Sequence, residues 1–269
     1  MSDSKTTRRI WLTGATSGIG LALARRLLEA GHRVALSARN PEALDELAAP
    51  YPQALCLPLD VSDREAVREA ASRLESAFGG LDWAILNAGT CEYLDARTFD
   101  SALVERVFAP NLFGAIYCVE AALPLLRRAR REGAPPLLAA TSSAAAYLPL
   151  PRAEAYGASK AALSHFLASL RLDLDAEGID VSLIHPGFVR TPLTDRNDFP
   201  MPCRVEPEAA ARIIVAGLEA HRLDIHFPRR LTLWLKLLGL LPVGLRHRIG
   251  RRLSRAPAHS PDSSAERRP

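Results

Sequence analysis

Short apolar runs alternate with amphipathic segments over most of this chain, and that alternation constrains its fold more than any other feature. Seven apolar runs are predicted to form strands, over residues 8–13, 34–37, 54–59, 83–86, 137–141, 180–184 and 224–227. The intervening segments repeat apolar residues with the helical period, over residues 19–30, 41–49, 63–78, 99–131, 156–178 and 207–221. Strands joined through helices run parallel, so we expect one α/β domain over residues 1–228. Its core would be a doubly wound parallel sheet of about seven strands, with helices on both faces.

Single residues predict the boundaries of several of these helices. Ser62 is expected to cap the third helix, with Glu65 three residues later completing a capping box. Gly31 is a suitable C-cap for the first helix. Pro110 and Pro124 are expected to interrupt the long helical region over residues 99–131, because proline lacks a backbone donor and clashes with the preceding turn.

Cysteine usage and hydropathy narrow the class of protein. The four cysteines are scattered without a Cys-x-x-Cys pair, which argues against a disulfide framework and a zinc site, so no metal is expected. The polar residues 1–9 contain no apolar signal-peptide core. No stretch reaches the roughly 20 uninterrupted apolar residues that a membrane-spanning helix needs. We therefore expect a cytoplasmic protein.

A glycine-rich turn follows the first predicted strand. Gly14, Gly18 and Gly20 come directly after that strand and open a helix. Glycines allow the backbone to approach a pyrophosphate, and the helix N-terminus offers free N–H groups and a positive dipole end. This arrangement is typical of a Rossmann-like dinucleotide-binding domain, in which the ligand lies at the carboxyl ends of the strands.

The second strand ends in a sequence that distinguishes between the two nicotinamide dinucleotides. An NAD site usually places Asp or Glu about 20 residues past the glycines, where it accepts from the ribose 2′-hydroxyl. Here that region reads Ser37-Ala38-Arg39-Asn40, with no acid. Because a guanidinium pairs well with phosphate, Arg39 favours NADP(H) over NAD(H).

Tyr156 and Lys160 lie four residues apart at the start of a predicted helix, and therefore on one face of it. A free phenol, with a pKa of about 10, is a poor acid or base near neutrality. A neighbouring ammonium favours the phenolate, so Lys160 is expected to lower the pKa of Tyr156 and make the pair a proton-transfer group.

These motifs together resemble those of the short-chain dehydrogenase/reductase family, in its shorter single-domain branch. The resemblance covers roughly residues 8–227 and rests on the order and spacing of five segments. They are Thr13-Gly14-x-x-x-Gly18-x-Gly20, Asn87-Ala88-Gly89, Asn111 in Asn-Leu-Phe-Gly, Tyr156-x-x-x-Lys160 with Ser143 thirteen residues before it, and Pro186-Gly187 with Thr191 after it.

The resemblance implies a role for each matching residue. Tyr156 would exchange a proton with the substrate oxygen, Lys160 would hold the nicotinamide ribose, and Ser143 would donate a hydrogen bond to that oxygen. Asn111 would hold a water linking Lys160 to solvent, although Pro110 before it departs from a regular helix. The implied cofactor-binding residues are Gly14, Thr16, Ser17, Gly18, Ile19, Gly20, Arg39, Asp60, Val61, Asn87, Ala88, Gly89, Tyr156, Lys160, Pro186, Gly187, Val189 and Thr191.

The C-terminal part of the chain extends beyond the minimal domain. Residues 229–255 form a predicted helical appendage with an apolar first half and a strongly basic second half. This segment carries eight basic and no acidic residues, so the rest of the chain has a net charge of −4 and nucleic acid is not an expected partner. The appendage could cover the substrate pocket, contact another subunit or lie on a membrane surface. The polar tail over residues 256–269 is predicted to be disordered.

The leading hypothesis is an NADP(H)-dependent oxidoreductase that interconverts an alcohol and a carbonyl, with an apolar or lipid-like substrate favoured by the leucine-rich appendage. The alternative is a nucleotide-sensing or scaffold protein that keeps the fold without turnover, in contact with a membrane surface through the appendage. The intact set of Ser143, Tyr156 and Lys160 argues against a silent protein, since a sensor needs no proton donor. The family habit implies a homodimer or homotetramer.

Overall fold

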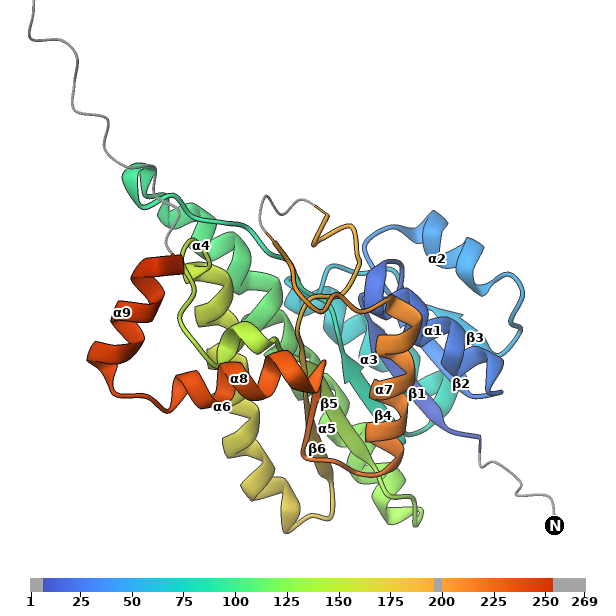
Figure 1. The fold of residues 1–269 in the computed structure, drawn as a ribbon. Coiled ribbons are helices and arrows are strands. Elements are labelled where there is room, and N and C mark those ends of the chain that lie inside the picture. The colour runs from blue at the N-terminus through green and yellow to red at the C-terminus, as the bar shows by residue number, and fades with distance from the viewer. Residues whose placement is uncertain (1–6, 196–199, 254–269) are drawn as a thin grey trace, which may run out of the picture.

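A computed structural model describes residues 7–195 and 200–253. The predicted disordered tail over residues 256–269 lies outside the described residues, as do the last two residues of the appendage. Seven parallel strands form one sheet in the order β3-β2-β1-β4-β5-β6-β7 (Figure 1). The strands are β1 (Arg9–Thr13), β2 (Arg33–Ser37), β3 (Ala54–Cys56), β4 (Trp83–Leu86), β5 (Leu137–Thr141), β6 (Asp180–Pro186) and β7 (Asp224–Phe227). The predicted doubly wound parallel sheet is confirmed.

Helices cover both faces of the sheet, and one apolar core lies between each face and its helices. One face packs against α1 (Gly18–Glu29), α2 (Pro41–Ala48) and α7 (Pro207–Glu219). The other packs against α3 (Arg64–Phe78), α5 (Ala115–Arg131) and α6 (Glu154–Asp175). The shorter helices are α4 (Ser101–Phe108), which lies against α6, and the single turns η1 (Ala96–Thr98) and η3 (Ala144–Ala146).

Strand β1 shows how the sequence divides its side chains between these cores. Successive side chains of a strand point to opposite faces, so a central strand must be apolar at every position. Trp11 enters the core beneath α3, α5 and α6, whereas Ile10 and Leu12 enter the core beneath α1, α2 and α7. The indole nitrogen of Trp11 donates to Ser37 Oγ at 2.9 Å, which satisfies its one buried polar atom.

Several predicted boundaries differ from the structure. The third helix is capped by Asp63, whose carboxylate accepts from the backbone N–H groups of Glu65 and Ala66, so the predicted Ser62 cap is wrong. The third strand ends at Cys56 rather than at residue 59. Pro124 lies inside an uninterrupted α5. At Pro110 the prediction of an interruption is confirmed, because Ala109–Gly114 form a π-helical segment, η2, between α4 and α5.

The helical region from Ser101 to Arg131 has the length and apolar composition of a membrane-crossing segment, but 44% of its most apolar window is buried inside the domain. It packs against α3 and α6, as a core helix does. The predicted appendage consists of two helices, α8 (Arg229–Gly239) and α9 (Val243–Leu253). They follow the edge strand β7 and lie at the opposite end of the sheet from α2 and β3 (Figure 1).

Candidate active site

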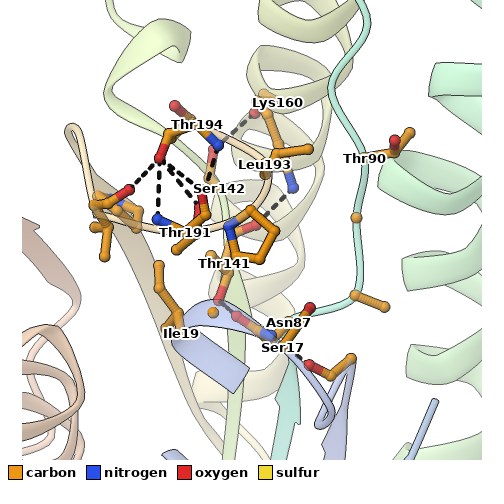
Figure 2. Close-up of a pocket in the computed structure, with 18 of the residues that line it drawn as sticks. Ser17, Ile19, Asn87, Thr90, Thr141, Ser142, Lys160, Thr191, Leu193 and Thr194 are labelled. Carbon is orange, nitrogen blue, oxygen red and sulfur yellow. Dashed lines mark hydrogen bonds between the residues drawn. The ribbon is translucent and has the colours of Figure 1, made fainter. Parts of the chain in front are cut away.

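A cavity of about 330 Å³ opens at the carboxyl ends of the strands, where a doubly wound sheet presents its ligand crevice. Most of the residues singled out in the sequence line it (Figure 2). They are Gly14, Ser17, Gly18, Ile19, Arg39, Asn87, Ala88, Gly89, Ser143, Tyr156, Lys160, Pro186, Gly187, Val189 and Thr191. Segments up to about 180 residues apart in the sequence therefore meet at one edge of the sheet.

The glycine turn has no room for side chains. Gly14 has a φ of +68°, and a Cβ on it would lie 2.8 Å from the Cα of Ala88. A Cβ on Gly20 would lie 1.9 Å from the carbonyl oxygen of Gly14. The backbone therefore closes tightly around the start of α1, whose first N–H groups have no partner within the helix. These groups form a site for an anion at the edge of the cavity.

Asn87 joins the carboxyl ends of three neighbouring strands. Its side chain donates to the carbonyl oxygen of Gly14 at 3.3 Å and accepts from Thr141 Oγ1 at 3.1 Å. Its backbone N–H donates to Thr13 Oγ1 at 3.0 Å. The ends of β1, β4 and β5 are thus held together at the floor of the cavity, where a loose edge would widen the site.

Tyr156 and Lys160 project into the cavity from the first turns of α6. The ammonium of Lys160 donates to the carbonyl oxygen of Thr141 at 2.8 Å, and Lys160 is only 4% exposed (Figure 2). Ser143 is also buried, and its Oγ accepts from the backbone N–H of Ala145 at 3.1 Å. Its side chain is close enough to Tyr156 to oppose a rise in the pKa of the phenol. The phenol, the hydroxyl and the ammonium therefore belong to residues that line the same cavity.

Burial determines the protonation states of Tyr156 and Lys160. It raises the pKa of Tyr156 to about 12, and the nearby Cys91 adds to that rise while the hydrogen bond from Ser143 opposes it. Burial also lowers the pKa of Lys160 to about 8. The expectation that Lys160 lowers the pKa of Tyr156 is wrong, because loss of solvent around the phenol dominates. At neutral pH the pair is a protonated phenol beside an ammonium.

Asn111 lies in the π-helical segment and is completely buried. Its amide nitrogen donates to the carbonyl oxygen of Thr90 at 2.9 Å and to Ser159 Oγ at 3.0 Å, and its oxygen accepts from the N–H of Thr90 at 2.8 Å. A Cβ on Gly89 would lie within 3.2 Å of both Asn111 Oδ1 and Lys160 Nζ. Asn111 therefore fixes the segment after β4 that passes beside Lys160. Its predicted water link to Lys160 stays a prediction.

Five predicted residues lie outside the lining of this cavity: Thr16, Gly20, Asp60, Val61 and Asn111. The carboxylate of Asp60 accepts from the backbone N–H of Ser62 at 2.8 Å and remains exposed. Val61 is buried, and a Cβ on Gly114 would lie 2.8 Å from its Cγ2. Both residues follow β3, which lies beside β2 and not beside the strands whose ends Asn87 joins.

The structure adds lining residues that no motif indicated: Thr90, Thr141, Ser142, Pro192, Leu193 and Thr194. Thr194 organises the loop that closes the cavity, because its hydroxyl donates to the carbonyl oxygen of Val189 at 2.6 Å and accepts from the N–H of Thr191 at 3.1 Å. A Cβ on Gly18 would lie 2.8 Å from Thr191 Cγ2, so this loop reaches the glycine turn. A run of Thr and Pro in a loop is too common to have marked these positions.

His185, at the end of β6, belongs to a polar network behind the cavity. Its Nδ1 lies 2.8 Å from Asp224 Oδ1, and its Nε2 lies 3.1 Å from Ser164 Oγ. Lys236 of α8 pairs with the other carboxylate oxygen of Asp224. His185 is buried and joins β6, β7, α6 and α8 through these contacts.

Within residues 7–195 and 200–253, no group of three or more His, Cys, Asp and Glu side chains is arranged to hold a metal ion. Cys91 lies close enough to Tyr156 and Lys160 to affect their charge. Burial raises the pKa of Cys91 to about 11. It is therefore a thiol at neutral pH, which disfavours a nucleophilic role.

Comparison with known proteins agrees with this geometry. A family model described as short chain dehydrogenase matches residues 8–199. An uncharacterized oxidoreductase of Myxococcus xanthus (strain DK1622) is 34% identical over 250 residues, which cover 91% of this chain and 97% of that protein. Dehydrogenase/reductase SDR family member 7B of Bos taurus is 38% identical over 194 residues, which cover 68% of this chain but 58% of the bovine protein.

Among solved structures, the Pseudomonas aeruginosa RhlG/NADP active-site complex superposes with a TM-score of 0.76. The two chains are 29% identical, and the match covers 83% of this chain and 96% of the other. The matched family region ends before α7, β7, α8 and α9. The C-terminal helices are thus the part of the chain that the family match describes least.

Proposed function

Because the chain belongs to the short-chain dehydrogenase/reductase family and is an oxidoreductase, we propose that it interconverts a carbonyl and an alcohol with NADP(H). In this proposal Tyr156 is the acid/base, Lys160 and Ser143 assist it, and the substrate is an apolar or lipid-like carbonyl compound. The observation that carries the proposal is that Ser143, Tyr156 and Lys160 line the same cavity as the glycine turn.

The cavity fits a nicotinamide dinucleotide. The tight glycine turn and the free N–H groups at the start of α1 suit a pyrophosphate, and Gly14, Ser17, Gly18 and Ile19 would hold it. The backbone of Pro186 and Gly187 would contact the nicotinamide end, with Lys160 on the adjoining ribose. The cofactor supplies or accepts a hydride. The proton chemistry is left to the side chains.

Tyr156 is suited to the direction that reduces the carbonyl. With a pKa of about 12 it carries its proton at neutral pH, and it would donate this proton to the oxygen that gains negative charge. Ser143 would donate a hydrogen bond to the same oxygen, and hydrogen bonds that strengthen as charge develops lower the barrier. The ammonium of Lys160, one turn away on the same helix face, would hold the nicotinamide ribose beside the phenol.

Arg39 supports NADP(H) over NAD(H). It lines the cavity and is exposed, and no ion pair in the described part of the chain occupies its guanidinium. The side-chain oxygen of the next residue, Asn40, caps α2 by accepting from the N–H of Ala43, so this oxygen is used in the helix cap. A relative whose structure was solved with NADP adds support to this preference.

Two features favour an apolar substrate. Pro192 and Leu193 lie in the loop at the cavity mouth, and Leu231 of the leucine-rich α8 reaches Gly187. The silent nucleotide sensor remains the alternative, but no residue of the proton-transfer set is missing. We also propose a homodimer or homotetramer, since Phe113 and Leu172 are exposed on the helical side that the family uses for pairing.

One screen tests this function. Purified protein is mixed with NADPH or NADH and with aldehydes, ketones, sterols and lipid-like carbonyls, and the absorbance of the reduced nicotinamide is followed. Loss of absorbance with a carbonyl of the apolar group, faster with NADPH than with NADH, is expected. Tight cofactor binding without turnover over the whole panel would instead support the sensor.

A further inference from the structure

Helix α8 has one face fixed to the body of the domain. Thr232 is completely buried, and Lys236 pairs with Asp224 of β7. A Cβ on Gly187 would lie 2.9 Å from Leu231 Cδ2, and a Cβ on Gly239 would lie 2.5 Å from the carbonyl oxygen of Tyr147. The inner face of α8 is therefore closely packed against the domain. These contacts fix the rotation of the helix and so determine which of its residues face outward.

The outer face of α8 is apolar and uncovered. The exposed side chains Leu233, Trp234, Leu237 and the C-cap residue Leu240 recur at helical spacing, and the start of α9 adds Val243 and Leu245. Trp234 is 66% exposed and Leu240 is 83% exposed. Isolated exposed apolar residues are ordinary, but a contiguous group on one helix marks a surface that contacts something else.

The same two helices carry arginines that form no ion pair with the described residues. Arg229 and Arg230 begin α8 and are exposed, as are Arg248 and Arg251 on α9. Arg246 and Arg251 also line a cavity between α9 and residues 145–161, where the Nε of Arg246 is buried. No acidic residue occurs from residue 229 to residue 255, and these five arginines form no ion pair within residues 7–195 and 200–253. Arginines elsewhere on the surface commonly face a carboxylate, as Arg64 does with Glu120 and Arg127 with Glu177.

We propose that the outer face of α8, together with α9, docks on the surface of an anionic lipid bilayer. An apolar face on helices that also carry exposed arginines matches an interface that offers acyl chains beside negative headgroups. A second copy of the chain fits less well, because an isologous contact would bring the same unpaired cations together. Nucleic acid would neutralise the arginines but leave Trp234 and the leucines without apolar contacts.

This docking does not depend on the proposed catalytic function. It bears on that function through Leu231, which packs against the cavity residue Gly187 from the inner face of the same helix. The cavity would consequently lie close to the lipid surface. Binding is measured without substrate or cofactor, so failure of either proposal can be told from failure of the other.

The three tryptophans of the chain make the test direct. Trp11 and Trp83 are at most 1% exposed, so a change in tryptophan emission on adding vesicles reports on Trp234. Full-length protein is mixed with vesicles of equimolar phosphatidylglycerol and phosphatidylcholine at low salt. A blue shift of the emission and sedimentation with the vesicles are expected, with little of either for phosphatidylcholine alone and a decrease as salt is added.

Two double variants separate the apolar from the charged contribution. One double variant combines Trp234→Ser with Leu237→Ser, and the other combines Arg229→Gln with Arg230→Gln. Each is expected to weaken vesicle binding by about tenfold or more, as measured by sedimentation. Phe99→Ser, at a residue of matching 68% exposure, and Arg64→Gln with Arg127→Gln are the controls and should bind as the wild type does.

Absence of wild-type binding to the anionic vesicles at low salt overturns the proposal. Equal losses in the variants and their controls overturn it as well. Light scattering provides a separate check: if the Trp234→Ser and Leu237→Ser variant changes the oligomeric state while vesicle binding persists, the face joins copies of the chain instead.

Discussion

The ammonium nitrogen of Lys160 lies 2.8 Å from the carbonyl oxygen of Thr141, the last residue of β5. This contact ties α6 to the carboxyl end of the central sheet and places the charge on the cavity wall. Gly89 follows β4 and passes so close that a Cβ there would lie 3.2 Å from the same nitrogen. The backbone at the ends of β4 and β5 thus surrounds the Lys160 ammonium. Burial there lowers the pKa of Lys160.

Cofactor affinity should therefore depend on pH near neutrality. Burial lowers the pKa of Lys160 to about 8, so the side chain is an ammonium below that pH and a neutral amine above it. We expect the Kd for NADPH to be constant in mildly acidic buffer and to rise by about tenfold to a hundredfold as pH passes through 8. Lys160→Met should bind weakly at every pH, in fluorescence titrations. A wild-type Kd without pH dependence would contradict this role.

The glycine turn should not tolerate a single methyl group. Gly20→Ala places a Cβ 1.9 Å from the Gly14 carbonyl oxygen, so the backbone must shift and the nucleotide site is lost. We expect a loss of several kcal/mol in the free energy of unfolding and no measurable NADPH binding. Gly244→Ala in α9 meets nothing within 4 Å and is the control, with stability unchanged or higher by up to about 1 kcal/mol. Denaturant unfolding measures the free energy of unfolding, and titration with NADPH measures binding.

Arg39 should determine the choice between the two dinucleotides. Arg39→Ala is expected to weaken NADPH binding by about tenfold to a hundredfold, which is the usual contribution of charge-assisted hydrogen bonds, and to change NADH binding little. Arg25→Ala removes an exposed arginine of α1 outside the cavity and should leave both unchanged. Equal losses for the two cofactors would reverse the assignment to NADP(H).

Asp224 should hold α8 against the sheet. Burial opposes its ionisation, but the hydrogen bonds from His185 and Lys236 outweigh burial and hold the pKa of Asp224 below its usual range. The stabilisation is therefore present at neutral pH and is lost as pH falls through the acidic range. Asp224→Asn should lower the Tm and speed tryptic cleavage at Arg230 and Lys236 severalfold. Asp180→Asn, which removes the His221 ion pair farther from α8, should leave that cleavage rate unchanged.

Much of this architecture could be predicted because it depends on local patterns. Apolar runs of the right length predicted all seven strands, and the position of Gly14 directly after one of them located the glycine turn that lines the cavity. Proline was less dependable. Pro110 coincides with a π-helical segment, but Pro124 sits inside a regular α5, where tertiary packing outweighs the cost of one missing backbone donor.

The features that could not be predicted from the sequence depend on contacts between distant segments. Ser62 and Asp63 are both good caps, and only the path of the chain after β3 selects Asp63. The lining position of Thr194 depends on a loop that folds back over the glycine turn. The pKa of Tyr156 was predicted in the wrong direction because the spacing to Lys160 was visible in the sequence but the burial of the phenol was not.

The central claim is that the phenol of Tyr156 transfers a proton to the substrate. Tyr156→Phe removes one oxygen and leaves the ring, so folding and NADPH binding should match the wild type. The measurement is the turnover number with the best carbonyl from the screen, beside the NADPH Kd of the same preparation. We predict a Kd within about twofold of wild type and a turnover number reduced by about a thousandfold. Turnover comparable to wild type in Tyr156→Phe would contradict the account.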